Sequence, residues 1–408
     1  MPVKPTPLSV AEATQFLLQA AVALTDTEII PTLEANGRVL AAAQVAQINV
    51  PGMDNSQMDG YAVRAADCTT GSARVPVSQR IAAGHVGMAL QPGTAARIFT
   101  GAMVPAGADA IVMQEACEVD GDHVIVRHQP QAGDWIRRIG EDIRSGATIL
   151  SAGVRLRAQE LGLAASVGLA SLPVLRKLRV AVFFTGDELA MPGQPLAPGA
   201  IYNSNRFLLR GLLENLGCEV SDYGIVPDQL QATRDTLRAA AAGHDLIITS
   251  GGVSVGEEDH VKPAVEAEGQ LNMWQIAMKP GKPLAFGEVH RAAGGKAFFL
   301  GLPGNPVSTF VTFLIFVRPF LLRLQGVQQV APRVLHLRAD FDWPRADRRQ
   351  EFLRARFNAQ GGLDLFAHQG SGVLTSTVWA DGLIDNPPGQ TIARGDLVRF
   401  APFDHLLH

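Results

Sequence analysis

The sequence predicts a multidomain protein in which a central α/β domain with a parallel sheet is combined with β-rich domains. From residue 177, apolar runs of strand length alternate with amphipathic helical segments, as in a parallel sheet with helical crossovers. Before and after this stretch, apolar runs are short and are broken by Gly, Pro and Asp. The length of 408 residues suits two to four folding units, and 47% hydrophobic residues supply enough apolar side chains for packed cores.

The N-terminal half combines a few helices with a β-rich segment. Ser9 and Glu12 have capping-box spacing ahead of a helical apolar pattern over 16–24. Residues 119–124 read as a hairpin with an Asp-Gly turn, and 157–167 as one short helix. We therefore expect two domains here. Residues 1–44 with 141–176 would form a small helical/linker domain, and 45–140 a β-rich module.

Residues 177–326 carry the predicted α/β domain, and 327–408 a small C-terminal β-barrel or sandwich. Two short strands are expected near Trp274 and Leu284, and a long apolar helix from about Asn305. The expected strands are 178–184, 219–226, 245–249 and 297–300, and the expected helices are 205–216, 229–242 and 261–268. Buried strands separated by helices imply right-handed crossovers in one sheet.

Charge and composition argue against several classes of protein. The formal charge is -4, from 35 basic and 39 acidic residues, so no basic face of the size needed for nucleic acid is expected. Residues 1–9 lack the apolar region of a secretory signal, and the apolar stretch 306–322 is short and interrupted, which predicts a buried helix and no membrane span. Three widely spaced cysteines predict neither disulfides nor a zinc site and favour a cytoplasmic location.

Polar, glycine-rich loops follow the predicted strands, where ligands of open α/β sheets bind. The loops are Thr185-Gly-Asp-Glu188, Pro227-Asp228, Ser250-Gly-Gly-Val-Ser-Val-Gly-Glu-Glu-Asp259 and Gly301-Leu-Pro-Gly-Asn-Pro-Val-Ser308. Two of them suit a phosphate held by backbone N–H groups at a helix start. The carboxylates Glu188, Asp228 and Asp259 would hold a divalent cation against that phosphate. Each loop alone could be a tight turn or a helix cap, but four together at strand ends favour a site.

Two further motifs have both a functional and a structural explanation. Lys279-Pro-Gly-Lys282 holds two of only six lysines on one turn, so that both ammonium groups could face one anion. The alternative is a solvated surface turn, and its position between two strands of the predicted sheet favours function. Asp59-Gly60 and Thr100-Gly101 lie in polar runs of the β-rich module. Physical reasoning alone favours a plain turn at Asp59-Gly60.

These motifs together resemble the molybdopterin molybdenumtransferase family, the MoeA and gephyrin E-domain type. The resemblance covers nearly the whole chain, and the glycine-rich domain alone also resembles molybdopterin adenylyltransferases and CinA proteins. Its segments are Met58-Asp-Gly-Tyr-Ala62, Thr100-Gly101, Thr185-Gly-Asp-Glu-Leu189, Thr249-Ser-Gly-Gly-Val-Ser-Val-Gly-Glu-Glu-Asp259, Met278-Lys-Pro-Gly-Lys-Pro283 and Leu302-Pro-Gly-Asn-Pro-Val-Ser308. This sequence has Gln275 where some bacterial members carry lysine.

The resemblance implies that molybdate is inserted into adenylylated molybdopterin with release of AMP, assisted by a divalent cation, usually Mg²⁺. It also implies an elongated homodimer in which Asp59 and Thr100 of one subunit face the α/β domain of the other. Asp259 would be the residue most directly tied to catalysis, with Glu188 and Asp228 as further metal ligands. The substrate cradle would comprise Thr185, Gly186, Ser250, Gly251, Gly252, Ser254, Pro303, Gly304 and Asn305.

The molybdate site implied by the resemblance combines residues of two domains. Because molybdate is a tetrahedral dianion, its site should offer cationic and hydroxyl donors with no carboxylate close by. The residues are Lys279, Lys282, Ser308, Arg349 and Ser371. A transient contact with a molybdopterin adenylyltransferase would deliver the substrate.

Two other functions stay open from the sequence. A non-catalytic scaffold of the same fold would be free to lose the carboxylates and the Lys279/Lys282 pair, which are all present. A molybdopterin-nucleotide pyrophosphatase or adenylyltransferase would keep the glycine-rich loop and the metal ligands. It would have no use for Lys279, Lys282, Arg349 and Ser371 as a joint oxyanion site.

Overall fold

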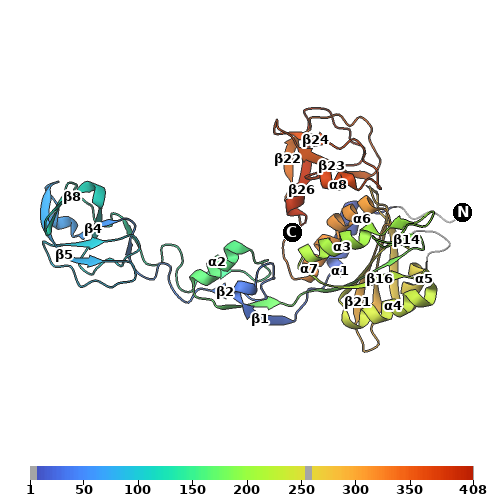
Figure 1. The fold of residues 1–408 in the computed structure, drawn as a ribbon, viewed down its shortest axis with the longest axis horizontal. Coiled ribbons are helices and arrows are strands. Elements are labelled where there is room, and N and C mark those ends of the chain that lie inside the picture. Colours follow the sequence, from blue (N-terminus) through green and yellow to red (C-terminus); the bar gives the residue numbers. More distant parts are fainter. Residues whose placement is uncertain (1–6, 253–259, 408) are drawn as a thin grey trace.

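The computed structural model describes residues 7–252 and 260–407 of the chain. The molecule is elongated, with a β-rich module at one end, a small body built around α2 and β1 in the middle, and the α/β part at the other end (Figure 1). The C-terminal sheet lies beside the α/β part (Figure 1). The structure therefore contains the α/β part and the β-rich parts expected from the sequence, and the β-rich module, the small body and the α/β part follow one another along the long axis.

A six-stranded mixed sheet forms the centre of the α/β part, in the order β16-β13-β17-β21-β20-β18. Its strands are β13 (Arg179–Thr185), β16 (Glu219–Val226), β17 (Leu246–Ser250), β18 (Gly269–Gln275), β20 (Pro283–His290) and β21 (Lys296–Leu302). The first four in that order are parallel, as predicted. The strands near Trp274 and Leu284 were expected to be short, but they are seven and eight residues long and pair antiparallel at one edge.

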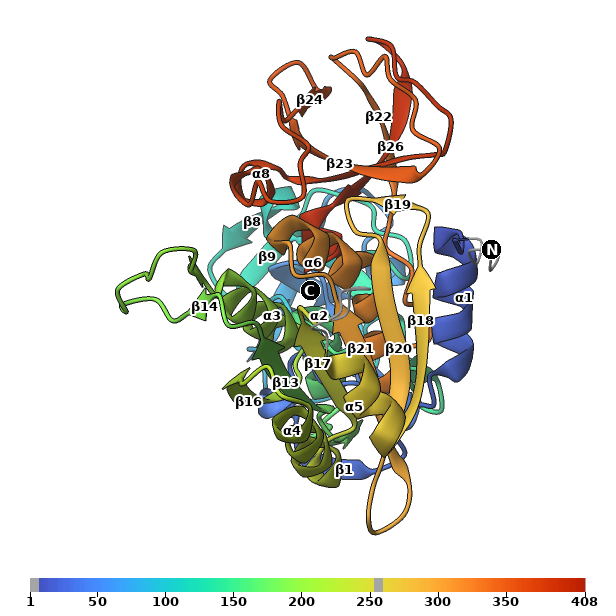
Figure 2. The same ribbon diagram turned by 90° about the vertical axis from the view of Figure 1, so that its right-hand side faces the viewer.

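Helices cover both faces of this sheet because its strands are apolar on both sides. Figure 2 shows the strands side by side with α4 (Leu230–Gly243) and α5 (Val261–Glu268) in front. These helices pack on the face that carries Ala181 and Phe183. The other face is covered by α3 (Ser204–Asn215) and by the long apolar helix.

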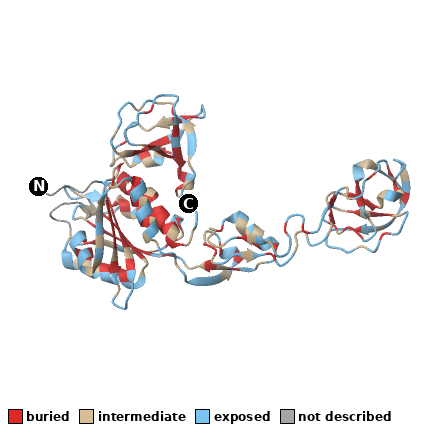
Figure 3. Ribbon diagram, turned by 180° about the vertical axis from the view of Figure 1, so that it is seen from behind, coloured by how far each residue is buried: buried red, intermediate tan, exposed pale blue. Residues whose placement is uncertain are grey.

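The long apolar helix runs over Pro306–Leu324 as α6 (Pro306–Thr312), a π-helical segment (η4, Phe313–Val317) and α7 (Arg318–Leu324). By length and composition it could span a bilayer, but 89% of its most apolar stretch is buried inside the protein. Figure 3 shows the helix and the strands beside it mostly as buried residues. The prediction of a buried core helix is confirmed.

The N-terminal helix α1 (Val10–Ala20) begins with the predicted capping box between Ser9 and Glu12. Its buried face, with Val10 and Leu17, packs into the same core as the long apolar helix. Phe16 meets Trp274 edge to face with ring centroids 4.7 Å apart. The expected grouping of residues 1–44 with 141–176 is therefore wrong for α1, which packs on the α/β core.

A small body and a β-rich sheet make up the rest of the N-terminal half. The small body contains α2 (Ala158–Ser166), as predicted, and two strand pairs. These pairs are β1 (Thr27–Pro31) with β12 (Ser171–Leu175) and β2 (Gln44–Val45) with β11 (Thr148–Leu150). A further pair, β3 (Asn55–Ser56) with β10 (Ile136–Arg137), belongs to the β-rich module, because Ile136 packs into its core. Short 3-10 helices are η1 (Thr32–Glu34), η2 (Ala65–Asp67) and η3 (Gln114–Ala116).

The β-rich sheet has the order β7-β4-β6-β5-β9-β8 and its own apolar core. Its strands are β4 (Gly60–Val63), β5 (Ala73–Ile81), β6 (Ala95–Ile98), β7 (Ala110–Met113), β8 (Cys117–Asp120) and β9 (His123–Val126). The hairpin predicted at 119–124 is formed by β8 and β9. This sheet lies at the far end of the molecule from the α/β part (Figure 1).

The C-terminal sheet includes a strand that comes from the middle of the chain. Its order is β19-β23-β25-β26-β22, with β24 paired to β23. The elements are β22 (Leu335–Arg338), β23 (Gln350–Phe357), β24 (Leu363–Leu365), α8 (Thr375–Trp379), β25 (Gly382–Asn386), β26 (Leu397–Pro402) and η5 (Phe403–His405). The added strand β19 (Met278–Lys279) runs parallel to β23 and opposes Lys279 to Glu351. The lysine motif thus bridges the two sheets.

Candidate functional site

Four loops of the α/β sheet leave neighbouring parallel strands at the same edge. In the register of these strands, Phe184 of β13 lies opposite Ser250, and Ser250 lies opposite Leu302 of β21. Thr185 pairs in turn with Val226, two residues before Asp228. The structure therefore brings together the ends of all four strands whose loops the sequence singled out. We call this edge the strand-end rim.

Ser250 is the centre of a buried hydrogen-bond network at the rim. Its hydroxyl donates to the carbonyl of Pro303 at 2.9 Å and accepts from the Nδ2 of Asn205 at 2.8 Å. The same Asn205 Nδ2 donates to the carbonyl of Gly304 at 2.7 Å, and Thr309 Oγ1 also donates to Pro303. Asn205 lies in the first turn of α3, just after the N-cap Asn203. The network fixes one glycine-rich loop against another.

Glycine is required at position 251 for two reasons. Its φ of +94° lies in the left-handed region, and a Cβ there would lie 3.0 Å from the carbonyl oxygen of Thr185. Gly252 also has a positive φ, of +65°. On the other loop, a Cβ on Gly304 would come 3.9 Å from the Cα of Gly251, and both Gly304 and Asn305 are exposed. The two loops therefore approach with bare backbone at the surface, which suits a phosphate held by N–H groups.

Two of the three predicted carboxylates lie at the rim, and the third lies outside the described residues. Glu188 is exposed and folds back over Gly186, whose Cβ would come 2.6 Å from its Oε2. Asp228 follows the neighbouring strand β16. Asp259 and Ser254 fall within 253–259, outside the described residues. Within residues 7–252 and 260–407, no three His, Cys, Asp or Glu side chains gather closely enough to hold a metal ion.

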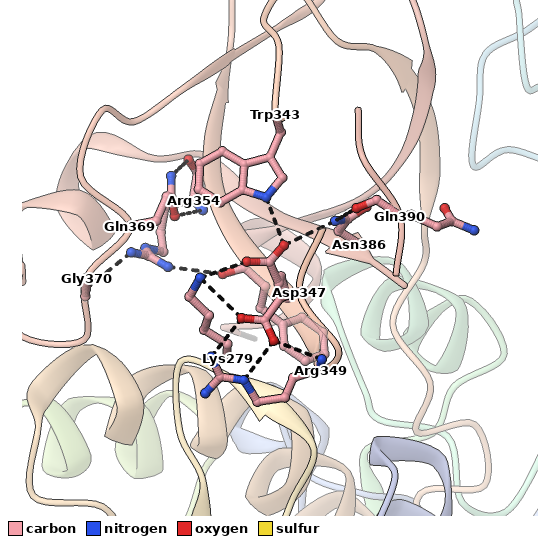
Figure 4. Close-up of polar contacts among 11 residues, drawn as sticks. Lys279, Trp343, Asp347, Arg349, Arg354, Gln369, Gly370, Asn386 and Gln390 are labelled. Atoms are coloured by element: carbon pink, nitrogen blue, oxygen red, sulfur yellow. Dashed lines mark hydrogen bonds and ion pairs between the residues drawn. The ribbon is translucent and has the colours of Figure 1, made fainter. Parts of the chain in front are cut away.

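Lys279 lies between two carboxylates of the C-terminal sheet (Figure 4). Its Nζ is 3.0 Å from Oε1 of Glu351 and 3.6 Å from Oδ2 of Asp347. Arg349 binds Asp347 bidentately, at 3.0 and 2.7 Å. The Trp343 ring lies over Lys279 with its centroid 5.9 Å from Nζ, and its Nε1 donates to Glu351 at 2.8 Å. Two cations and two carboxylates thus form one compact cluster, which we call the lysine cluster.

The lysine cluster opens into a hollow of about 610 Å³ lined by Lys279, Trp343 and Asp347. Hydrogen bonds from the Arg349 side chain hold the pKa of Asp347 well below its usual range, so the carboxylate stays ionised. The expectation of an oxyanion site without carboxylates close by is therefore wrong. An incoming dianion would have to draw Lys279 and Arg349 away from Asp347.

The remaining predicted oxyanion residues differ in exposure. Ser308 lies in α6 and is only 3% exposed, whereas the Lys282 side chain is exposed. Ser371 accepts a hydrogen bond at its carbonyl from the N–H of Val307, 3.0 Å away, at the start of α6. This bond ties the loop of the C-terminal sheet directly to the rim. Ser308 is thus buried in the first turn of α6, and Lys282 lies on the protein surface.

Asp59 and Thr100 form a separate pair in the β-rich module. Asp59 Oδ1 accepts from both the N–H and the hydroxyl of Thr100, each at 2.8 Å. These two bonds, the backbone N–H first, lower the pKa of Asp59. The module lies at the far end of the chain from the rim (Figure 1). Within one chain, the structure does not bring this pair to the other predicted site residues.

Sequence reasoning missed several residues that position the site. Asn205 carried a usable signal, because it is a polar residue in the first turn of a predicted helix whose following face is apolar. Glu351 lies two residues after the predicted site residue Arg349, but the sequence does not show that its side chain is buried, with an exposure of 1%. Asp347, Trp343 and Asn386 had no signal. Asn386 reaches Glu351 through the pairing of β25 with β23, and Lys279 meets this group only through the pairing of β19 with β23.

Three family models match successive parts of the chain. Residues 8–168 match the MoeA N-terminal region, described as domains I and II. Residues 181–323 match a probable molybdopterin binding domain, and residues 336–403 match the MoeA C-terminal region, domain IV. The fold and the rim thus define a class of multidomain protein built around a molybdopterin-binding α/β domain.

Relatives of full length narrow this class to one family. The molybdopterin molybdenumtransferase of Haemophilus influenzae is 40% identical, covering 98% of this chain and 100% of the relative. Molybdopterin molybdenumtransferase 2 of Mycobacterium tuberculosis is 41% identical, covering 88% and 90%. The crystal structure of the molybdopterin biosynthesis moeA protein of Pyrococcus horikoshii superposes with a TM-score of 0.85 at 29% identity, covering 97% and 100%. The chain belongs to the molybdopterin molybdenumtransferase family.

Proposed function

We propose that this protein inserts molybdenum from molybdate into adenylylated molybdopterin and releases AMP. In this reaction a water oxygen adds to a phosphorus of the phosphoanhydride as AMP leaves, and the two dithiolene sulfurs replace two oxygen ligands of the metal, which leave as water. The observation that carries the proposal is the contact of the glycine-rich rim with the C-terminal sheet, which carries Glu351 of the lysine cluster, through the Val307–Ser371 hydrogen bond. A phosphate cradle and an oxyanion site side by side are what a two-substrate reaction of this kind needs.

In this proposal, the rim binds the pterin phosphates. The backbone of Gly251, Gly252 and Gly304 approaches the phosphates, and the network around Ser250 keeps the loops in place before the substrate arrives. The Ser250 hydroxyl is engaged on both sides and is buried. Its role is therefore to hold the loops, and the ligand contacts come from backbone N–H groups and from Thr185, Gly186, Pro303 and Asn305.

Molybdate binds at the lysine cluster in this proposal, assisted by Lys282, Ser308 and Ser371. Lys279 and Arg349 exchange Asp347 for the dianion, because both contact Asp347, and Asp347 and Lys279 line the 610 Å³ hollow. Glu351 stays with Lys279 and with the Trp343 indole, and so limits the movement of the ammonium group. The paired carboxylates keep the empty site neutral, and the arriving oxyanion replaces one of them.

The proposed metal ion is Mg²⁺, held by Glu188, Asp228 and Asp259. Carboxylate oxygens are the protein ligands that Mg²⁺ prefers, and two of the three follow the adjacent strands β13 and β16. When bound, the ion neutralises charge on the phosphoanhydride. Asp259 is the residue whose loss we expect to abolish the reaction.

We also propose a homodimer in which Asp59 and Thr100 reach the rim of the partner subunit. The elongated chain supports this, since this polar pair lies far from the rim of its own chain (Figure 1). Mixing Asp59→Ala with Asp259→Ala subunits should restore about a quarter of wild-type activity, because half the dimers then hold one intact site. No recovery on mixing would argue against a shared site.

The cell compartment and the substrate donor complete the proposal. A cytoplasmic location is supported by the free thiols of Cys68, Cys117 and Cys218, of which two are buried. A molybdopterin adenylyltransferase would hand over the adenylylated pterin in a transient contact. Pull-down of such an enzyme in the presence of adenylylated molybdopterin tests this contact.

Molybdate-dependent release of AMP is the direct test. Wild-type protein, adenylylated molybdopterin and Mg²⁺ should release AMP only when molybdate is added. Asp259→Ala should abolish release, and Lys279→Met should raise the molybdate concentration needed by at least about tenfold. Lys262→Met removes the same charge from the exposed face of α5 and should leave the activity unchanged. Release without any oxyanion would identify a nucleotide pyrophosphatase, and no release would favour a scaffold.

A further inference from the structure

A basic hollow of about 680 Å³ lies where three parts of the molecule meet, away from the rim and the lysine cluster. Its walls come from the small body with Arg155, from the ends of α3 and the start of α7 with Arg318, and from the end of the C-terminal sheet with His405. We call it the junction pocket. The helix α7, which carries Arg318, and the C-terminal end of the chain, which lies near His405 in sequence, are marked in Figure 1.

Six cations line the junction pocket, and four of them form no ion pair in the described part of the chain: Arg155, Lys177, Arg318 and Arg333. The other two are paired, Arg38 with Glu28 and Arg157 with Glu160. The acidic lining residues are Glu214, which binds Arg210 at 2.8 Å, and the exposed Asp404. Arg155 uses two of its nitrogens on carbonyls, those of Gly37 at 3.3 Å and Asn215 at 2.9 Å.

Two buried nitrogens of this pocket have no hydrogen-bond partner among the described residues. Arg318 is only 6% exposed and donates to the carbonyls of Val330 at 3.0 Å and His405 at 2.9 Å. Its Nε and the Nδ1 of His405 are buried and make no hydrogen bond to any described residue. Arg354, buried in the C-terminal sheet, instead uses all three nitrogens, on Ser376, Phe352 and Gly370. An unpartnered buried guanidinium nitrogen is costly unless a ligand satisfies it.

Electrostatics agree with this geometry. Burial lowers the pKa of Arg318 to about 10, and the nearby charge of Arg155 lowers it further in the same direction. Burial also lowers the pKa of Arg155. Two like charges are thus held close together in a partly desolvated place, where an anion between them would be favoured.

We propose that the junction pocket binds a phosphoryl group, either inorganic phosphate or the phosphate of a small metabolite, and that this anion ties the three parts of the molecule together. Guanidinium groups match phosphate oxygens in a planar fork, and the hollow is large enough for a mononucleotide. Nucleic acid does not fit, because the pocket is a single hollow on a chain of net charge -4. This inference does not depend on the proposed reaction.

Thermal unfolding at constant ionic strength tests the proposal, with phosphate exchanged for chloride. Inorganic phosphate should raise the melting temperature of wild-type protein, and Arg155→Met and Lys177→Met should each weaken the apparent affinity at least about tenfold. One control should keep the response of wild type: Arg238→Met removes one charge from the exposed surface of α4. Arg318→Met is not needed, so a folding defect in that buried position does not affect the test.

A comparison of ligands separates the two sources of the phosphoryl group. If AMP stabilises the protein at concentrations at least about tenfold lower than phosphate, and Arg155→Met removes that advantage, the ligand is a phosphorylated metabolite. Equal potency of the two identifies phosphate itself. The proposal is overturned if phosphate does not stabilise wild type, or if Arg155→Met and Lys177→Met respond to phosphate as wild type does.

Discussion

The lysine cluster and the junction pocket are both basic hollows, but they solve the problem of buried cations in opposite ways. In the lysine cluster, Lys279 and Arg349 are paired with Glu351 and Asp347, so the formal charge is close to zero. In the junction pocket, Arg155 and Arg318 meet carbonyl oxygens and each other. In our proposals, the first arrangement gives up a carboxylate partner when it binds an anion, whereas the second gains a partner for charges that no carboxylate balances.

This difference has a practical meaning for locating ligand sites. A charge-balanced cluster looks like a structural ion-pair network, and an unbalanced one looks like a site, although the family resemblance assigns chemistry to the balanced one. Charge balance alone therefore does not distinguish them. What distinguishes them is which substitutions destabilise the empty protein, and the four predictions below address that.

The largest effect is expected for Glu351→Ala in the lysine cluster. Glu351 is 1% exposed and accepts hydrogen bonds from Lys279, from the Trp343 indole and from Asn386 at 3.3 Å. Its removal leaves buried donors unpaired and should lower the free energy of unfolding by about 3–5 kcal/mol. Urea denaturation measures the loss. Glu214→Ala, at the junction pocket, should change the free energy of unfolding by less than about 1 kcal/mol. Equal losses for the two variants would contradict the proposed difference between the lysine cluster and the junction pocket.

The next effect compares two buried arginines. Arg354 has all three nitrogens hydrogen-bonded, whereas Arg318 has an unpartnered Nε. Arg354→Met should therefore cost about 2–4 kcal/mol of unfolding free energy, and Arg318→Met about 1–2 kcal/mol, because the second change also removes an unfavourable charge. Chemical denaturation without phosphate gives both values. A larger loss of unfolding free energy for Arg318→Met than for Arg354→Met would mean that the charge of Arg318 does not destabilise the folded protein.

A pH dependence is expected only for the balanced cluster. Arg349 lowers the pKa of Asp347, so the ionised pair stabilises the folded protein above the ordinary aspartate pKa of about 4 and this contribution is lost as the pH falls below it. Asp347→Asn should cost about 1–2 kcal/mol near neutral pH, and this cost should shrink as the pH falls from about 4 through the lowered pKa of Asp347. Arg349→Met should show the same convergence with wild type. A difference that persists in acid would assign the loss to packing.

The smallest effect is a response to salt at the junction pocket. Raising chloride from about 0.05 to about 0.5 M screens the repulsion between Arg155 and Arg318 and should stabilise wild type by about 0.5 kcal/mol relative to Arg155→Met. Parallel thermal scans of the two proteins measure this. Stabilisation of both proteins by the same amount would show that the two charges do not repel each other appreciably.

Sequence patterns predicted the elements of the α/β domain well because each is a local signal. The strand β16 covers the expected residues 219–226, and the helix α5 covers 261–268. The glycine loop at 250–252 could be placed at a strand end for the same reason. The direction of the edge strands β18 and β20 could not, since an apolar run of strand length carries no information on its partner's direction.

Contacts between distant segments were the part that the sequence did not reveal. The amphipathic pattern of α1 predicted a buried face, but not that Leu17 would join the core of the long apolar helix. Lys279 was expected beside other cations because its motif is basic. Its pairing with Glu351 depends on β19 joining a sheet whose other strands begin more than fifty residues later. The proposed site residues in 253–259 and the intersubunit role of Asp59 stay predictions.

The chain passes between the α/β part and the β-rich module twice, and the two passages run side by side. Val50 forms an antiparallel bridge with Ile143, and β2 pairs with β11 just before it. The module is thus an insertion whose entry and exit are adjacent, so a short turn could close the gap if it were excised. Because two adjacent passages lead to the module, they restrict its rotation more than a single linker would. A change of angle where these passages leave the α/β part would therefore move Asp59 along an arc whose radius is the length of the passages.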